Sequence, residues 1–288
     1  MRWIALPVML LATYCGRLVL AQQETPIVDV QEQKSATPKP IEVDVQGERK
    51  SPEWTQSRTF TTTRVWRLDA GEMAGELWYT QRLKHDGNSG ENTYLWQAEY
   101  QSGVVKGLQV DAYFNYAYDK DDGPHIDGAS LETRIGPWDY GQIWGNPVLY
   151  LEFKGQTRAA DRAEARILLG GELGMPELHA GFNAFYEQDV DSATGNLDDF
   201  MLEIETGASA AVSYAIVPQY SVGLEGTVAA EQQGADPDNP DAFQGVVKIG
   251  PAMWFNLVEG HFFIVASALA GFTHHSDGFA TTFVVGVR

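Results

Sequence analysis

Apolar and polar residues alternate along most of the chain beyond residue 58. In residues 107–119, for example, Val110 and Phe114 fall on one face of an extended chain, and Gln109 and Asp111 fall on the other. A period of two residues is typical of a half-buried β-strand and not of a helix. Twelve such segments occur, near residues 75–83, 92–101, 107–119, 127–136, 146–157, 161–173, 177–188, 200–214, 219–231, 243–255, 261–272 and 279–287.

The lengths of these segments and their connections indicate a membrane. Most segments contain ten or more residues, whereas a soluble strand usually has about five or six and a tilted membrane-spanning strand about 9–11. Tight turns, such as 103–106 and 217–218, alternate with longer acidic or glycine-rich connections, such as 188–199 and 232–242. We therefore predict an all-β, antiparallel transmembrane β-barrel of about 12 strands, with short periplasmic turns and longer acidic extracellular loops.

The N-terminal part has a different pattern. Residues 1–21 combine a basic start, an apolar middle and small residues before position 22, which is the layout of a secretory signal peptide. Residues 22–58 are polar and repeat one block at 26–31 and 40–46. They predict a flexible periplasmic linker, or alternatively a docking peptide for a periplasmic partner. The expected domains are thus a signal peptide (1–21), a linker (22–58) and an outer-membrane β-barrel (59–288).

Composition excludes several classes of protein. Asp and Glu number 39 against 20 Lys and Arg, for a net charge of −19, which argues against nucleic-acid binding. A single Cys excludes a disulfide scaffold. The 44% hydrophobic and 11% aromatic content argues against a disordered chain. Beyond the N-terminus there is no apolar run of about 18 residues, so a helical membrane protein is not expected.

If the apolar strand faces meet lipid, the polar faces line the lumen. The predicted lumen-lining residues are Glu99, Asp111, Glu132, Arg134, Glu152, Arg162, Glu164, Arg166, Glu203, Glu205, Glu225 and Lys248. Two interpretations stay open: Glu–Arg ladders that fill a narrow barrel, and a water-filled channel that favours cations or polyhydroxylated solutes. Apolar residues on the inner face of 261–272, among them Phe263 and Val265, would also suit small apolar solutes.

One short segment is a weak candidate for catalysis. The His-x-Ser spacing of His274 and Ser276 resembles the His-x-Ser-Asn motif of outer-membrane lipid A deacylases, which implies His274 as base and Ser276 as nucleophile. Asp277 stands in place of the Asn, and the acidic residue that the family has about a dozen positions later has no counterpart. An exposed loop with two histidines is the simpler interpretation.

A wider resemblance covers roughly residues 75–288. Segments 94–119, 127–134 and 209–225 resemble uncharacterised Gram-negative outer-membrane barrels, similar in pattern to transporters of the phenol-degradation (MetA-pathway) type. This resemblance implies an outer-membrane location, solute passage and no cofactor. The sequence departs from the pattern at Arg288, where such barrels usually carry the aromatic residue that the assembly machinery recognises.

The expected function is a passive channel or transporter for small solutes, or a structural envelope barrel, in the outer membrane of a Gram-negative bacterium. The alternatives are an outer-leaflet lipid hydrolase and a soluble exported β-barrel that binds a ligand, whose apolar face would point inward. We expect no enzyme activity, metal or cofactor. The expected partners are outer-membrane lipid, lipopolysaccharide and the barrel-assembly machinery, and the periplasmic partner of residues 22–58 is unknown.

Overall fold

The computed structural model describes residues 51–84, 92–119, 123–192, 203–232, 243–258 and 261–288. The predicted signal peptide, the repeats of the linker and most of the long acidic connections lie outside these residues. Within the described ranges, no helix is both long and apolar enough to cross a membrane.

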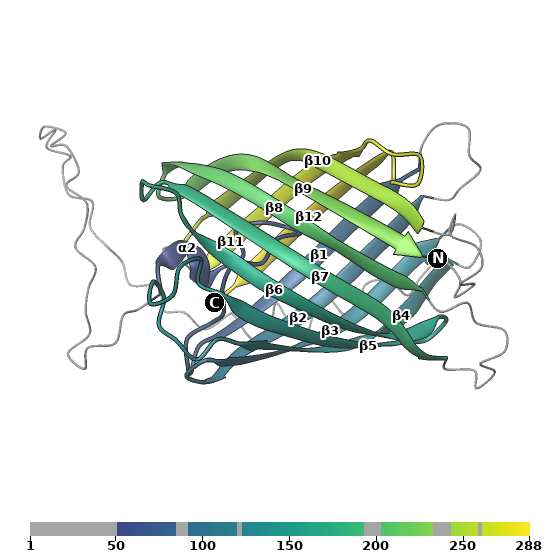
Figure 1. The fold of residues 1–288 in the computed structure, drawn as a ribbon, viewed down its shortest axis with the longest axis horizontal. Helices are drawn as coiled ribbons and strands as arrows, with labels where there is room; N and C mark the ends of the chain where they lie inside the picture. The colour runs from purple at the N-terminus through teal and green to yellow at the C-terminus, as the bar shows by residue number, and fades with distance from the viewer. Residues whose placement is uncertain (1–50, 85–91, 120–122, 193–202, 233–242, 259–260) are drawn as a thin grey trace, which may run out of the picture. The chain divides into compact units, whose positions relative to one another are not determined.

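Twelve antiparallel strands close into a barrel, in which β1 pairs with both β2 and β12 (Figure 1). The strands are β1 (Met73–Leu83), β2 (Thr93–Val105), β3 (Leu108–Asp119), β4 (Gly123–Ile135), β5 (Val148–Gln156), β6 (Ala160–Glu172), β7 (Leu178–Ser192), β8 (Ile204–Val217), β9 (Tyr220–Gln232), β10 (Phe243–Asn256), β11 (Phe262–Gly271) and β12 (Phe279–Val287). Each corresponds to one of the twelve predicted segments, and the predicted fold class is confirmed.

The two ends of the barrel carry different connections. At one end, here called the turn end, residues 106–107 join β2 to β3, and residues 218–219 join β8 to β9. The opposite end, here called the loop end, carries longer connections, such as 193–203 between β7 and β8 and 233–242 between β9 and β10. The exceptions are 136–147 at the turn end and the short connections 120–122 and 157–159 at the loop end. With these exceptions, short turns at one end and longer loops at the other match the outer-membrane type.

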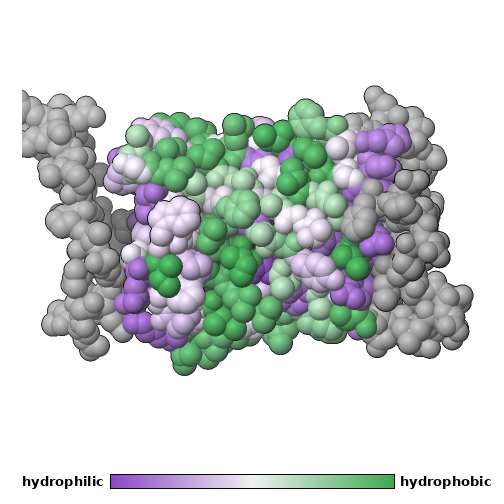
Figure 2. Space-filling model, in the orientation of Figure 1, coloured by the Kyte–Doolittle hydropathy of each residue, from purple (hydrophilic) through white to green (hydrophobic). Residues whose placement is uncertain are grey.

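The outer face of the barrel is apolar. Phe114 is 71% exposed and Leu131 57% exposed on neighbouring strands. Tyr118 near the loop end and Tyr214 near the turn end are exposed rings of the kind that form interfacial girdles. Figure 2 shows hydrophobic residues across the middle of the barrel and hydrophilic ones toward its two ends. A soluble ligand-binding barrel would have the opposite arrangement, with its apolar face inside.

Residues 51–72, here called the plug, lie inside the barrel ahead of β1. The plug begins with the short helix α2 (Glu53–Gln56) and continues as extended chain. Its large side chains are buried, with Phe60 at 0% and Trp66 at 2% exposure. Residues 51–58 were expected to belong to the flexible linker, but they pack within the barrel. The plug continues past residue 58 without forming a strand.

The plug follows a hairpin path between the turn end and the middle of the lumen. Near its start, Trp54 stacks on His179 at the beginning of β7, with ring centroids 4.3 Å apart. At its tip, the hydroxyl of Thr61 lies 2.6 Å from that of Ser267 in the middle of β11. On its return, Arg67 donates a hydrogen bond to the carbonyl of Gly136, just beyond β4. The barrel wall therefore holds the plug along both legs.

Two glycines make room for the returning leg. Gly170 of β6 and Gly181 of β7 are directly paired in the sheet. A Cβ atom on Gly170 would lie 2.8 Å from Cβ of Val65, and one on Gly181 would lie 2.6 Å from Cγ1 of the same side chain. Both distances are shorter than carbon atoms tolerate, so this close approach of the plug requires glycine on both strands.

Candidate functional site

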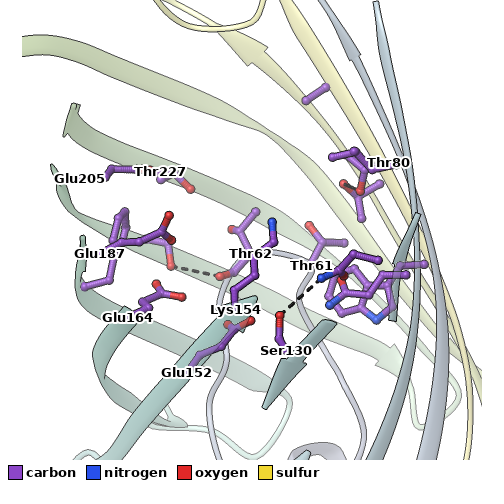
Figure 3. Close-up of a pocket in the computed structure, with 18 of the residues that line it drawn as sticks. Thr61, Thr62, Thr80, Ser130, Glu152, Lys154, Glu164, Glu187, Glu205 and Thr227 are labelled. Carbon is purple, nitrogen blue, oxygen red and sulfur yellow. Dashed lines mark hydrogen bonds between the residues drawn. The ribbon is translucent and has the colours of Figure 1, made fainter. Parts of the chain in front are cut away.

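A cavity of about 480 Å³ lies above the plug, on the loop-end side of the lumen (Figure 3). Its floor includes Arg58, Thr61, Thr62 and Arg64 of the plug, and its walls carry charged and aromatic side chains of the strands. A second cavity, of about 20 Å³, separates parts of the plug from β2 and β4 on the turn-end side. The plug therefore lies between the cavity, here called the vestibule, and the turn end of the lumen.

One carboxylate from each of seven successive strands forms a continuous line on the inner wall, here called the acidic row. The sheet pairs Asp111 with Glu132, Glu132 with Glu152, Glu152 with Glu164, Glu164 with Glu187, Glu187 with Glu205, and Glu205 with Glu231. Because the strands tilt, the row climbs from the fourth residue of β3 near the turn end to the penultimate residue of β9 near the loop end. Like charges directly opposite each other destabilise a sheet, so the row needs positive charge nearby.

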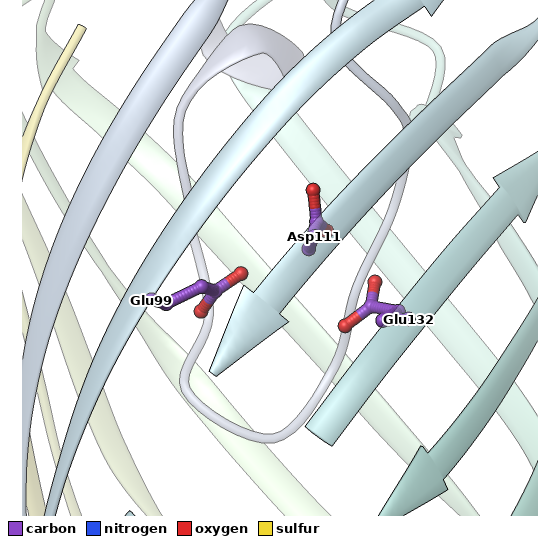
Figure 4. Close-up of side chains that lie close together, drawn as sticks. All are labelled: Glu99, Asp111 and Glu132. Atoms are coloured by element: carbon purple, nitrogen blue, oxygen red, sulfur yellow. The ribbon is translucent and has the colours of Figure 1, made fainter. Parts of the chain in front are cut away.

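Arginines supply that charge in the lower part of the row. Arg134 lies 3.2 Å from Asp111 and 2.5 Å from Glu132, and Tyr113 donates a hydrogen bond to Glu132. Figure 4 shows Glu99, Asp111 and Glu132 gathered on neighbouring strands, with one oxygen from each within 4.8 Å of the others. Arg134 is also 4.0 Å from Glu99. A single guanidinium of the barrel itself therefore lies against all three carboxylates of this group.

The upper part of the row is less well balanced. Arg162 forms ion pairs with three carboxylates. It lies 2.6 Å from Glu187 and 2.5 Å from Glu203, and its third partner is Asp189. Among the residues that the structure describes, no ion pair joins Glu205 or Glu231 to a basic side chain. Glu205 and Glu231 therefore face the cavity without a basic side chain in contact, on a wall that carries both acidic and basic groups.

Glu225 of β9 holds the tip of the plug. One of its carboxylate oxygens accepts hydrogen bonds from the amide and hydroxyl of Thr61, at 3.1 and 2.7 Å. The other accepts from the amide and hydroxyl of Thr62, at 2.6 and 2.7 Å, and from the amide of Thr63, at 2.9 Å. Glu225 is 1% exposed. Hydrogen bonds to an ionised group are stronger than neutral ones, so these five satisfy the buried carboxylate.

Two plug arginines neutralise a second pair of buried carboxylates. Nε of Arg58 lies 2.7 Å from Glu76, and its Nη2 lies 3.3 Å from Glu99. Nη2 of Arg64 lies 2.8 Å from Glu99. Burial by itself lowers the pKa of Arg64, but the charges of Glu99 and Glu76 outweigh it and raise the pKa above its ordinary value. Arg64 therefore stays charged.

The predicted lumen-lining residues fall into three groups. Glu152, Arg162, Glu164, Arg166, Glu205 and Lys248 line the cavity. Glu99, Asp111, Glu132, Arg134 and Glu225 are buried beside one another or against the plug. Glu203 pairs with Arg162 toward the loop end. The lumen thus combines the two arrangements that the sequence left open, with ion-pair ladders in its lower half and an open cavity above.

The predicted His-x-Ser pair does not form a catalytic arrangement. His274 is exposed, while Ser276 is 5% exposed. The hydroxyl of Ser276 donates to the carbonyl of Thr273 at 2.8 Å and accepts from its amide at 3.2 Å, as in a turn. Asp277 pairs with Lys248 at 2.6 Å. Within the described part of the chain, no hydrogen bond joins His274 to Ser276, so nucleophile and base are not brought together.

The plug residues at the site are absent from the sequence-based prediction. They lie in a threonine-rich stretch without alternation, which looks like part of a linker. One signal was available: Arg58, Arg64 and Arg67 fall within ten residues of a chain that has only 20 Lys and Arg in 288 positions. A local concentration of positive charge beside a barrel with an acidic inner face indicates an internal partner for that face.

No protein-family model matches the sequence, and no curated protein matches it. Solved structures do match. An outer membrane channel from Pseudomonas putida F1 is 10% identical, with a TM-score of 0.56, over 77% of this chain and 97% of the channel. The NanC porin is 12% identical, with a TM-score of 0.49, over 75% of this chain and 98% of the porin. The first likeness shows that the fold is that of outer-membrane β-barrels, while the second is too weak to support an inference.

Proposed function

We propose that the protein is an outer-membrane β-barrel that admits small solutes, and small cations in particular. The observation that carries this proposal is the acidic row, which follows the wall of a cavity at the loop end. Carboxylates in a confined lumen raise the local concentration of cations and repel anions. Neighbouring strands are about 4.8 Å apart, so a cation in the cavity lies near more than one carboxylate of the part of the row that lines it.

The location and orientation follow from the same features. The apolar outer face suits a bilayer, and the short connections of the turn end would face the periplasm, with the longer loops outside. Outer-membrane lipid, lipopolysaccharide and the barrel-assembly machinery are the partners that such a barrel needs. The resemblance of residues 75–288 to transporters of the phenol-degradation type supports passage of solutes. We propose passage and no catalysis, because His274 and Ser276 are not placed to react together.

Conductance in planar bilayers tests this function. Under a salt gradient, the full chain should show openings whose reversal potential indicates a preference for cations. Replacing both Glu205→Gln and Glu231→Gln should shift that potential toward zero, because the two cavity carboxylates without an ion pair lose their charge. Glu177→Gln is the matched control, since Glu177 is exposed in the turn between β6 and β7. The proposal is contradicted if the bilayers show no conductance although the heat-modifiable gel mobility of the protein shows that the barrel is folded.

A further inference from the structure

Three side chains of the barrel form a site that the plug fills with its own cation. Glu76 of β1 and Glu99 of β2 are directly paired in the sheet, and they are 3% and 4% exposed. Trp78 lies two residues beyond Glu76 on the same face of β1, and its indole donates a hydrogen bond to Glu99 at 3.1 Å. The guanidinium carbon of Arg58 lies 3.8 Å from the centre of the Trp78 ring.

This arrangement recognises a flat cation. Two buried carboxylates side by side are unfavourable unless a positive charge lies against both. A guanidinium can donate to two carboxylates in its plane while its face stacks on an aromatic ring, which a compact ammonium group cannot do. Arg58 makes all three contacts, with Glu76, Glu99 and Trp78. The walls belong to the barrel, whereas the cation belongs to a segment that is not part of the wall.

We infer that Glu76, Glu99 and Trp78 form a binding site for small guanidinium compounds, and that Arg58 occupies this site as an internal ligand until such a compound replaces it. The inference rests on the proposed function, because the compound would arrive through the vestibule. Arg58 and Trp78 both line the cavity, whereas Glu76 and Glu99 are buried and do not. A solute that enters from the loop end therefore meets Arg58 and Trp78 first, and it reaches the two carboxylates when Arg58 leaves.

Replacement of Arg58 would loosen the plug. The tip residues that Glu225 holds, Thr61 to Thr63, follow Arg58 by only a few positions. When Arg58 leaves, an incoming guanidinium keeps Glu76 and Glu99 neutralised, so the exchange avoids a buried unpaired charge. A neutral solute of the same shape cannot make this exchange. Binding of the ligand and release of the plug are therefore coupled.

A thiol at a buried position beside the tip of the plug reports its release without any measurement of conductance. Ser209 is 2% exposed, and its hydroxyl accepts a hydrogen bond from Thr63 at 3.0 Å. Full-length Ser209→Cys protein, with Cys15→Ser to leave one thiol, should react slowly with a methanethiosulfonate reagent. Methylguanidinium should raise the rate severalfold and saturably, and methylurea, its neutral analogue, should not. Equal effects of the two compounds, or no effect of either, would overturn the inference.

Calorimetry with the empty site gives an independent measurement. Arg58→Gln in the full chain should bind methylguanidinium more tightly than the wild type, because Arg58 no longer competes, and adding Trp78→Leu should weaken that binding severalfold. Arg67→Gln is the control, since Arg67 is a plug arginine that bonds the carbonyls of Gly136 and Trp138 instead of the site. If Arg58→Gln is a folded barrel by its heat-modifiable gel mobility and binds methylguanidinium no more tightly than the wild type, the proposed site is wrong. Silent bilayers together with methylguanidinium binding would reject the channel and leave the site standing.

Discussion

Single carboxylates inside the barrel have different roles according to what neutralises them. Glu132 lies against Arg134, a residue of the same strand. Glu225 has backbone amides and hydroxyls of the plug instead, and within the described residues no basic side chain pairs with it. Alternation along β9 predicted that Glu225 faces inward. It could not predict the plug as partner, because the contact joins positions more than 160 residues apart.

The contacts of Glu225 predict a looser plug when its charge is removed. Glu225→Gln keeps the shape of the side chain but replaces a charged acceptor with a neutral amide, and its NH₂ group faces donors. Losing charge-assisted hydrogen bonds of a buried group costs about 1–3 kcal/mol, which is a rise of about 5- to 150-fold in the open fraction of the plug. The rate at which the thiol of the Ser209→Cys variant is modified measures this open fraction. An unchanged rate, with Glu177→Gln as control, would show that Glu225 does not hold the plug.

Elements of the barrel were predictable because their periodicity is local. A strand with one lipid-facing and one lumen-facing side must alternate, and the sequence shows this alternation in each of the twelve strands. The acidic row was predictable only in part. The inward direction of Glu152, Glu164 and Glu205 follows from alternation, but their alignment depends on the register between strands, which the sequence does not show.

The plug was not predictable as an element, since it has no period of its own. It is extended chain whose backbone donors bond to barrel side chains, as Arg64 does when its amide donates to Asn183 at 2.8 Å. Such a segment has the composition of a linker, and only its surroundings fix its conformation. The plug fits inside the barrel because Gly170 and Gly181 are paired beside it. From the strand pattern alone, these glycines only indicate positions where the strands are less stable.

The paired glycines give a prediction for the plug as a unit. Gly181→Ala would place a Cβ 2.6 Å from Cγ1 of Val65 and 2.8 Å from Cγ2 of Thr63. Overpacking of this kind costs about 1–3 kcal/mol, and we expect it to displace the returning leg and to expose Cys at Ser209. Val65→Ala should restore part of the protection, because it removes the nearer clashing methyl group and leaves that of Thr63. Gly245→Ala on β10 is the control, since nothing lies within 4 Å of its Cβ position. If adding Val65→Ala to Gly181→Ala does not restore protection of the Ser209→Cys thiol, the clash with Val65 is not what displaces the plug.

At the scale of the whole molecule, apolar and charged side chains of the strands lie on opposite faces of the barrel wall. Large apolar side chains cover the outside, whereas most of the charged groups of the strands lie within, in the ladders or on the cavity wall. Glu205 and Glu231 face the cavity without an ion pair, and basic residues of the plug lie against the buried carboxylates of Glu76 and Glu99.

This sorting predicts how the barrel responds to a charge placed on its outer face. Leu131 is 57% exposed in the central part of β4, and Val258 is 55% exposed in the connection after β10 at the turn end. An arginine near the middle of a bilayer costs about 2–4 kcal/mol, and one near its surface costs about 0–1. Leu131→Arg should therefore lower the free energy of unfolding in lipid vesicles by about that larger amount, and Val258→Arg by little. Reversible urea unfolding, followed by tryptophan fluorescence, measures both. Equal losses for the two variants would mean that the apolar belt of this barrel does not face lipid.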